Sequence, residues 1–157
     1  MTSDLVDPAG LLPSAAPATS SGELTVMHIP HAAVSVHLAR RRLREDLLLA
    51  GVPTDSVDDA EIVLSELLGN AVRHAQAGPS GAVEVRWKVG DGVVEVIVTD
   101  GGAATAVTPR EPEEFSVSGR GLHIVGAIAR SWGVIDRRVA RTVWAALVLP
   151  RRSAQHV

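Results

Sequence analysis

The sequence contains no cysteine among its 157 residues. This absence excludes disulfides, thiol nucleophiles, cysteine-ligated zinc and iron–sulfur clusters. Long apolar runs are also missing, since no stretch approaches the roughly 20 residues that span a bilayer. The N-terminus lacks the basic-then-apolar pattern of a secretion signal. We therefore expect a soluble, cytoplasmic protein that makes no membrane contact.

Lysine is nearly absent too, because Lys88 stands alone against fourteen arginines. A P-loop nucleotide site needs a lysine directly after a glycine-rich loop. Lys88 lies in an alternating, strand-like segment with no such glycines before it, so a P-loop is excluded. The formal net charge of −3 also argues against a nucleic-acid-binding protein, which would carry a basic excess. Any nucleotide site in this chain must hold phosphates without lysine.

The remaining composition is ordinary for one globular domain. The chain is 46% hydrophobic and 21% charged, within the usual range for soluble proteins. Its length suits a single domain with a sizeable core. Residues 1–22 are rich in small residues and proline without periodicity, so we predict a flexible leader. We assign residues 23–152 to the folded domain and residues 153–157 to a tail.

Hydrophobic periodicity divides this domain into strands and helices. An Asp-Gly pair between two alternating runs indicates a hairpin, and a long irregular loop is typical of a lid. In chain order we predict a strand (23–29), two helices (31–50 and 54–76), a hairpin (83–89 and 93–99), the loop (101–118), a helix (121–131) and a second hairpin (134–137 and 142–149). This order favours an α+β fold, a two-layer sandwich whose mainly antiparallel sheet is covered on one face by helices.

The first polar constellation lies on the second predicted helix. Glu66 and Asn70 are four residues apart and share one helix face, which Arg73 or His74 extends. Their oxygen atoms suit hydrated Mg²⁺, and the carboxylate can act as a general base. Gly69 costs about 1 kcal/mol in a helix interior, which the close approach of a ligand or another backbone would explain. The alternative is a solvated helix face with a close helix contact.

The second constellation is Asp100-Gly-Gly102, at the end of the first predicted hairpin. A period of two puts Asp100 on the same side as Val94, Val96 and Val98. If that side faces the core, the carboxylate needs a hydrogen-bond donor, and the exocyclic amine of a purine would supply one. The alternative is a simple strand-ending turn.

The third constellation is Ser118-Gly-Arg-Gly-Leu-His123, directly before an amphipathic helix. Glycines at a helix start expose backbone N–H groups, and the helix dipole there attracts phosphate. Arg120 and His123 add charge. The dinucleotide-binding fingerprint of the Rossmann fold needs a third glycine at position 124, which is isoleucine, so that interpretation is excluded.

Three other patterns have simpler interpretations. The arginine run at positions 40–44 is interpreted as a solvated helix face, or as a contact for an acidic partner. The pair His28 and His31 is a poor metal site, because Pro30 intervenes and no third ligand lies nearby. The three tryptophans, Trp87, Trp132 and Trp144, are most simply core residues.

Taken in chain order, these constellations resemble the GHKL superfamily with the Bergerat fold, which includes gyrase, Hsp90, histidine kinases and MutL. The resemblance covers about residues 23–150. The compact size and the first motif are most similar to anti-sigma-factor serine kinases of the SpoIIAB and RsbW type. The matching segments are Glu66-Leu-Leu-Gly-Asn70-Ala-Val-Arg-His74-Ala for the N-box, Asp100-Gly-Gly102 for the G1 box, Ser-Gly119-Arg-Gly121-Leu for the G2 box, and Arg141-Thr142-Val-Trp144 for the last strand.

The resemblance implies an ATP site with Mg²⁺ and a role for each matching residue. Glu66 would be the general base and Asn70 the Mg²⁺ ligand, with Glu66 joining through water; Asp100 and Thr142 would contact adenine; Gly102 would let the backbone approach it; Gly119, Arg120, Gly121, Leu122 and His123 would hold phosphates, and Arg73 and His74 would complete the nucleotide site. The chain departs from the family at Ala104, where the G1 box usually has its second glycine.

The resemblance further implies a regulatory protein with serine/threonine kinase activity toward an anti-anti-sigma partner of the STAS type, acting as a monomer or a homodimer. A second hypothesis is a non-catalytic ATP-binding module that sequesters a sigma factor or another partner. Glu66 favours the first, and Ala104 favours the second. A detached histidine-kinase catalytic domain is a third. None of these hypotheses requires direct contact with nucleic acid.

Overall fold

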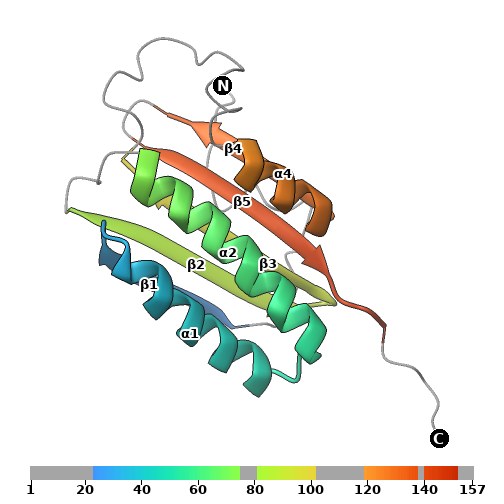
Figure 1. Cartoon of the computed structure of the whole chain (residues 1–157). Helices are drawn as coiled ribbons and strands as arrows, with labels where there is room; N and C mark the ends of the chain where they lie inside the picture. Colours follow the sequence, from blue (N-terminus) through green and yellow to red (C-terminus); the bar gives the residue numbers. More distant parts are fainter. Residues whose placement is uncertain (1–22, 75–80, 102–118, 138–139, 152–157) are drawn as a thin grey trace, which may run out of the picture.

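The computed structural model describes residues 23–74, 81–101, 119–137 and 140–151. Within these residues, one five-stranded antiparallel sheet is covered on one face by three helices (Figure 1). The predicted leader, the lid loop beyond residue 101 and the tail lie outside these ranges. The observed arrangement confirms the predicted α+β sandwich.

The sheet is antiparallel throughout its described part, with strand order β1-β2-β3-β5-β4. Two hairpins, β2–β3 and β4–β5, meet where β3 pairs with β5, and β1 adds to the outer side of β2. The strands are β1 (Leu24–Pro30), β2 (Ala82–Gly90), β3 (Val93–Asp100), β4 (Ser131–Asp136) and β5 (Arg141–Val148).

The helices are α1 (Val34–Leu49), α2 (Thr54–His74) and α4 (Gly119–Ile128). The long helix α2 crosses the middle of the sheet, with α1 on one side and α4 on the other (Figure 1). It packs against both of these helices and against β3. The middle helix is therefore the element that joins the two halves of the molecule.

Local turn chemistry fixes two of the connections. Asp91 and Gly92 both have positive φ values, 54° and 78°, as a two-residue hairpin turn between β2 and β3 requires. Gly51, with a φ of 84°, follows the end of α1, where a residue in the left-handed region commonly stops a helix. Both features follow the predictions from sequence.

The core lies between the sheet and the three helices. Valines of β2 and β3 alternate toward the helices and pack with leucines of α1 and α2. Trp87 is also buried there, at 1% exposure, whereas Trp132 is 38% exposed, so the prediction that it is a core residue is wrong. The largest fully buried side chains are Trp87, Leu43, Leu47, Leu64, Leu67 and Leu68.

The boundary between α4 and β4 differs from the prediction. The apolar spacing extends the predicted helix to Ser131, but α4 ends at Ile128 and β4 already begins at Ser131. The reason is pairing across the sheet, because the Arg130 backbone N–H donates to the Ala146 carbonyl at 2.8 Å. A contact with a partner strand therefore decides the boundary.

Among the described residues, no helix is both long and apolar enough to cross a membrane.

Candidate functional site

The C-terminal half of α2 presents the predicted carboxylate and carboxamide one helical turn apart. Glu66 and Asn70 are both half-buried. The guanidinium of Arg73, one turn further on, donates a hydrogen bond from Nη2 to Asn70 Oδ1 at 3.2 Å. The structure therefore brings Asn70 and Arg73 into contact, with Glu66 on the preceding turn. The side chain of His74 lies outside the described part.

Gly69 provides the space for this arginine. A Cβ atom built at position 69 would lie 2.9 Å from Arg73 Nη1, which is closer than a side-chain carbon can approach. The sequence predicted that the missing side chain admits a ligand or another backbone. In the structure, a guanidinium from the next turn of the same helix takes that place.

His31 contacts the same stretch of α2. Its Nε2–H donates to the backbone carbonyl of Ala71 at 2.9 Å, which requires Nε2 to carry the proton because a carbonyl only accepts. His28, by contrast, lies on β1 and pairs with Glu84 at 3.2 Å. The two histidines therefore have different partners, that of His31 on α2 and that of His28 on β2.

Asp100 ends β3 beneath the helix layer. Its side chain is 5% exposed, and it lies on the same face as the buried Val94, Val96 and Val98. The sequence placed Asp100 on the side of these valines and left open whether that side faces the core; in the structure it does. A carboxylate that ends a buried strand in this way presents an acceptor at the rim between sheet and helices, while Gly102 lies outside the described residues.

Thr142 does not join Asp100. It pairs in register with Thr99, and their hydroxyl oxygens are 3.0 Å apart, so both side chains lie on the sheet face opposite the helices. The residue of β5 in register with Asp100 is Arg141. The family resemblance implied that Asp100 and Thr142 contact one base together, whereas the structure places them on different faces of the sheet.

The N-terminus of α4 lies at the third predicted constellation. The helix begins at Gly119, two residues earlier than predicted, so Gly119, Arg120 and Gly121 form its first turn. No acidic residue occurs in that turn, whereas α2 carries Asp55 in its own first turn. The positive end of the α4 dipole therefore has no acidic side chain from its own first turn beside it.

The second turn of α4 fixes the helix in the molecule. Leu122 is buried at 8% exposure and His123 is exposed, and α4 packs against α2. The side chains of residues 119–121 are outside the described part. The structure therefore places the backbone of the glycine-rich start beside the helix that carries Glu66 and Asn70.

The donor set fits a Mg²⁺–nucleotide. Magnesium is usually held by one or two carboxylate or amide oxygens together with substrate phosphates, and Glu66 and Asn70 supply such oxygens. No group of three or more His, Asp or Glu side chains that could hold a metal on its own occurs in the described part of the chain. The residues thus suit an ion that arrives with phosphates.

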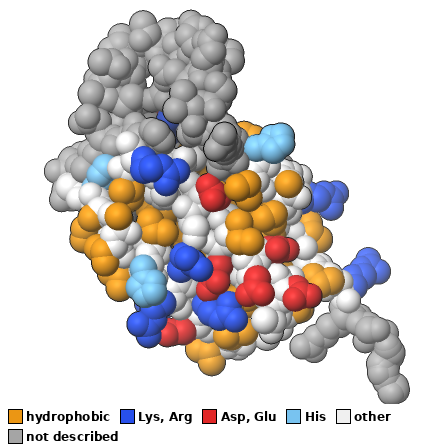
Figure 2. All heavy atoms as spheres, in the orientation of Figure 1, with side chains coloured by type: hydrophobic (Ala, Val, Ile, Leu, Met, Phe, Trp, Pro, Cys, Tyr) orange, Lys and Arg blue, Asp and Glu red, His pale blue; other side chains and the backbone are white. Residues whose placement is uncertain are grey.

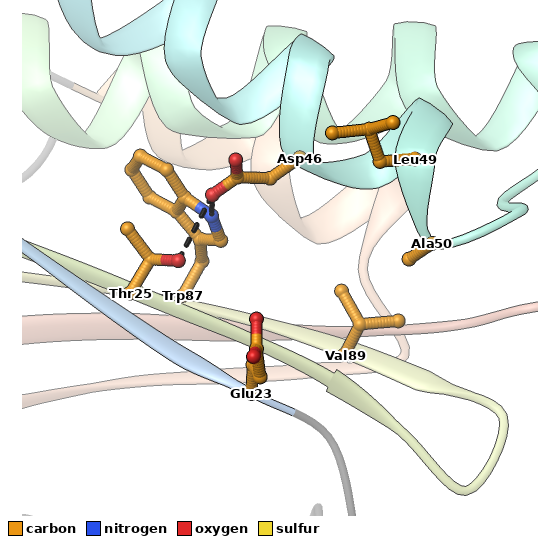
Figure 3. A pocket seen from close by; sticks show the side chains of 7 residues that line it. All are labelled: Glu23, Thr25, Asp46, Leu49, Ala50, Trp87 and Val89. Atoms are coloured by element: carbon orange, nitrogen blue, oxygen red, sulfur yellow. Dashed lines mark hydrogen bonds between the residues drawn. The ribbon is translucent and has the colours of Figure 1, made fainter.

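A pocket of about 270 Å³ lies at the other end of the sheet, among α1, β1 and β2 (Figure 3). There, Asp46 Oδ2 accepts hydrogen bonds from Thr25 Oγ1 and Trp87 Nε1, each at 2.9 Å. Arg42 Nε donates to the other oxygen at 3.2 Å. Because both oxygens of this carboxylate accept hydrogen bonds from protein donors, we interpret the pocket as a structural junction and not as the candidate site.

The arginine run on α1 forms ion pairs with α2. Arg44 lies 3.0 Å from Asp58 and 3.4 Å from Glu61, and Arg40 lies 3.7 Å from Glu61. The hydrogen bond to Asp58, with the nearby Glu61, raises the pKa of the Arg44 guanidinium above its ordinary value. Figure 2 shows basic and acidic side chains interleaved on this part of the helix face, which agrees with a solvated helix face.

Comparisons with known proteins identify the family and the fold. A family model described as histidine kinase-like ATPase domain matches residues 29–146. The serine-protein kinase RsbW of Staphylococcus aureus, from strains bovine RF122 and JH9, is 28% identical over 85 residues, covering 53% of this chain and 54% of each relative. The chain therefore spans about half the length of the curated relatives it matches.

A solved structure shares the fold. The crystal structure of the RsbU and RsbW domains of Rv1364c from Mycobacterium tuberculosis matches with a TM-score of 0.66 at 20% identity. The match covers 83% of this chain and 33% of that chain. The likeness supports the same fold for this chain.

Proposed function

The chain belongs to the histidine kinase-like ATPase domain family, as its motifs suggested, and on that premise we propose that it binds ATP with Mg²⁺ and transfers the γ-phosphate to a serine or threonine of a small anti-anti-sigma partner of the STAS type. The match to relatives named as serine-protein kinases supports the choice of acceptor. The partner class follows from the same likeness.

One observation carries the proposal. A half-buried carboxylate and a carboxamide lie one turn apart on α2, next to a helix start that has no acidic residue in its first turn. Phosphoryl transfer needs an acceptor for the hydroxyl proton, oxygen ligands for a divalent cation and donors for phosphate oxygens. These three requirements match Glu66, Asn70 and the N–H groups of α4.

Each residue has a distinct part in the proposed reaction. Glu66 accepts the proton of the attacking hydroxyl, which raises the nucleophilicity of its oxygen. Asn70 holds Mg²⁺, whose chemistry when bound is to neutralise charge on the phosphates. The backbone N–H groups at Gly119–Gly121 bind phosphate oxygens, and Asp100 accepts the amine of adenine. None of these parts needs a lysine.

A second candidate function is sequestration without phosphate transfer. In it, ATP shapes the surface that holds a sigma factor, and the nucleotide is not consumed. The substitution of alanine for the usual glycine at position 104 favours this candidate, because it alters the motif that leads into the lid. The two candidates share the nucleotide site and differ only in the use made of Glu66.

Nucleotide binding is the first test. Addition of ATP and Mg²⁺ to the purified protein should raise its melting temperature, because a ligand that binds only the folded state stabilises it. Binding measured by calorimetry should give a Kd that depends on Mg²⁺. An unchanged melting temperature together with no binding heat would reject the site.

Phosphate transfer is the second test. Glu66→Gln should leave ATP binding intact and reduce transfer to a STAS substrate by roughly two to four orders of magnitude, the usual loss for a general base. Glu61→Gln is the matched control, since Glu61 is a carboxylate on the same helix whose described partners are Arg40 and Arg44. Wild-type binding without transfer to any STAS substrate would favour the sequestering module.

A further inference from the structure

Three charged residues form a row across three strands at the rim of the sheet. Arg141 on β5 pairs in register with Asp100 on β3 and with Asp136 on β4. Residues in register point to the same face of an antiparallel pair, so all three lie on the side of the helices. Arg141 Nε is 3.5 Å from Asp136 Oδ1, and the arginine side chain is only 12% exposed. The guanidinium is therefore held between two carboxylate-bearing strands.

The neighbouring threonine has no access to this rim. Thr142 is 5% exposed, and its hydroxyl oxygen lies 3.0 Å from that of Thr99 on the opposite face. A one-residue shift along a strand turns a side chain to the other face. For Thr142 to reach Asp100, β5 would have to slip by one residue and turn Val143 and Ala145 out of the core.

We propose that Arg141, and not Thr142, is the base-contacting residue of β5, and that its guanidinium donates a hydrogen bond to the N1 acceptor of adenine beside Asp100. The inference rests on the proposed ATP site and deepens it. It assigns adenine specificity to an Asp–Arg pair carried by two neighbouring strands.

The chemistry of the base matches this pair. The edge of adenine presents a donor, the N6 amine, directly beside an acceptor, the ring atom N1. Asp100 supplies only acceptors when ionised and Arg141 supplies only donors, so the two side chains complement that edge. Guanine presents the reverse order, an acceptor at O6 beside a donor at N1. Arginine stays charged at any physiological pH, which keeps its donors in place.

Comparing the binding of two nucleotides tests the Arg141–adenine contact independently of the other contacts in the site. ATP and 1-deaza-ATP differ in one ring atom, because a C–H group replaces the N1 acceptor. We expect the wild-type protein to bind ATP at least about tenfold more tightly, as loss of one hydrogen bond to a charged group predicts. Arg141→Met should bind both nucleotides with similar Kd values, and Arg141→Lys, which retains a charged donor, should recover part of the preference.

Thr142→Val is the matched control, since it removes the adjacent hydroxyl at almost constant volume. It should keep the full preference for ATP over 1-deaza-ATP. The ratio of the two Kd values is measured within each variant, so it is independent of any change in stability, which thermal unfolding records separately.

Two results would overturn the inference. They are an unchanged ratio in Arg141→Met, and a ratio that collapses in Thr142→Val. A wild-type protein that binds ATP and 1-deaza-ATP equally would also overturn it while leaving the ATP site standing. A wild-type protein that binds neither nucleotide would instead reject the proposed function.

Discussion

The two ends of the sheet each place an aspartate between strands and helices, half-buried Asp46 and buried Asp100, and the two aspartates have different surroundings. At the hairpin end, Asp46 accepts hydrogen bonds from Thr25 and Trp87 (Figure 3) and also from Arg42 on its own helix. At the other end, Asp100 stands in register with Arg141. It lies on the sheet face covered by the helices, among them α2 with the half-buried Glu66 and Asn70. At the first end the aspartate links three elements by hydrogen bonds. At the second end a carboxylate and a guanidinium stand side by side where the strands end.

This difference shows how a buried polar group can be assigned a role. A carboxylate that links three elements through hydrogen bonds contributes to stability, because its loss leaves donors without partners. At the other end, Asp100 and Arg141 are only 5% and 12% exposed, and they stand in register at the ends of β3 and β5. Because the Asp46 carboxylate is used to join elements, the cavity next to it is a weaker guide to function than the polar groups at the other end of the sheet.

The largest effect on stability should come from Asp46→Ala. The change removes the acceptor of the Trp87 indole N–H, which is buried at 1% exposure, and of the half-buried Thr25 hydroxyl. We expect the free energy of unfolding to fall by about 2–3 kcal/mol in urea denaturation. Asp46→Asn keeps an acceptor oxygen and should lose less. A loss below about 0.5 kcal/mol in Asp46→Ala would contradict the assigned structural role.

Asn70→Ala should show the opposite behaviour. Its described partner is the exposed Arg73, so the free energy of unfolding should change by less than about 0.5 kcal/mol. Removal of a metal-ligating oxygen should weaken ATP binding in Mg²⁺ by roughly tenfold to a hundredfold and leave binding in EDTA unchanged. Calorimetry in both buffers measures this. Asn70→Asp, which keeps the oxygen, is the control, and an equal loss in EDTA would remove Asn70 from the metal site.

A third carboxylate sharpens the contrast with Asp46. Glu95 on β3 is buried at 4% exposure, and its Oε2 has no hydrogen-bond partner within the described part of the chain. Burial raises the pKa of the Glu95 carboxyl, and the charge of Lys88 opposes that rise. An acid with a raised pKa in the folded state costs stability as pH rises from its unfolded value through its folded value.

Glu95→Gln should therefore increase the free energy of unfolding at neutral pH, by about 1 kcal/mol. The gain should disappear in acid, below the ordinary pKa of a glutamate, where both side chains are neutral. Urea unfolding at pH 7 and at pH 4 measures the difference. The control is Glu84→Gln, which removes a carboxylate that pairs with His28 and Arg86 and should bring no gain. A gain for Glu95→Gln that is independent of pH would contradict the explanation.

Gly69→Ala should have the smallest effect. Alanine gains about 0.5–1 kcal/mol of helix stability over glycine, but its Cβ displaces the flexible end of Arg73 from its place 2.9 Å away. The net change in unfolding free energy should stay within about 0.5 kcal/mol, while the contact of Arg73 with Asn70 is lost. Thermal unfolding measures the first and a crystal structure the second. Strong destabilisation would show that another element needs this glycine.

Features governed by neighbours in the chain were predictable. The Asp91–Gly92 turn and the helix end at Gly51 depend on local backbone conformation. They can therefore be predicted from the residue types at these positions. The side of β3 occupied by Asp100 follows from the period of two. Likewise, Glu66 and Asn70 share a helix face because of their spacing.

Features governed by distant pairing were not predictable. Both faces of β5 are largely apolar and buried, from Val143 and Ala145 on one side to Ala146 on the other, so alternation cannot say which residue meets Asp100. The exposed position of Trp132 at the outer strand has the same origin. Within each strand, the alternation of side chains between the two faces can be predicted from the sequence. The register between strands cannot, because it depends on segments far apart in the sequence.

The sequence by itself determined the fold class, the two hairpins, the exclusion of a P-loop and the set of polar motifs. Each of these depends only on residue types and on their spacing over short stretches of the chain. Only the tertiary structure decided that Arg73 fills the space at Gly69 and that Arg141 stands opposite Asp100. Register and packing are properties of pairs of elements, and they are fixed when the core side chains of both elements meet.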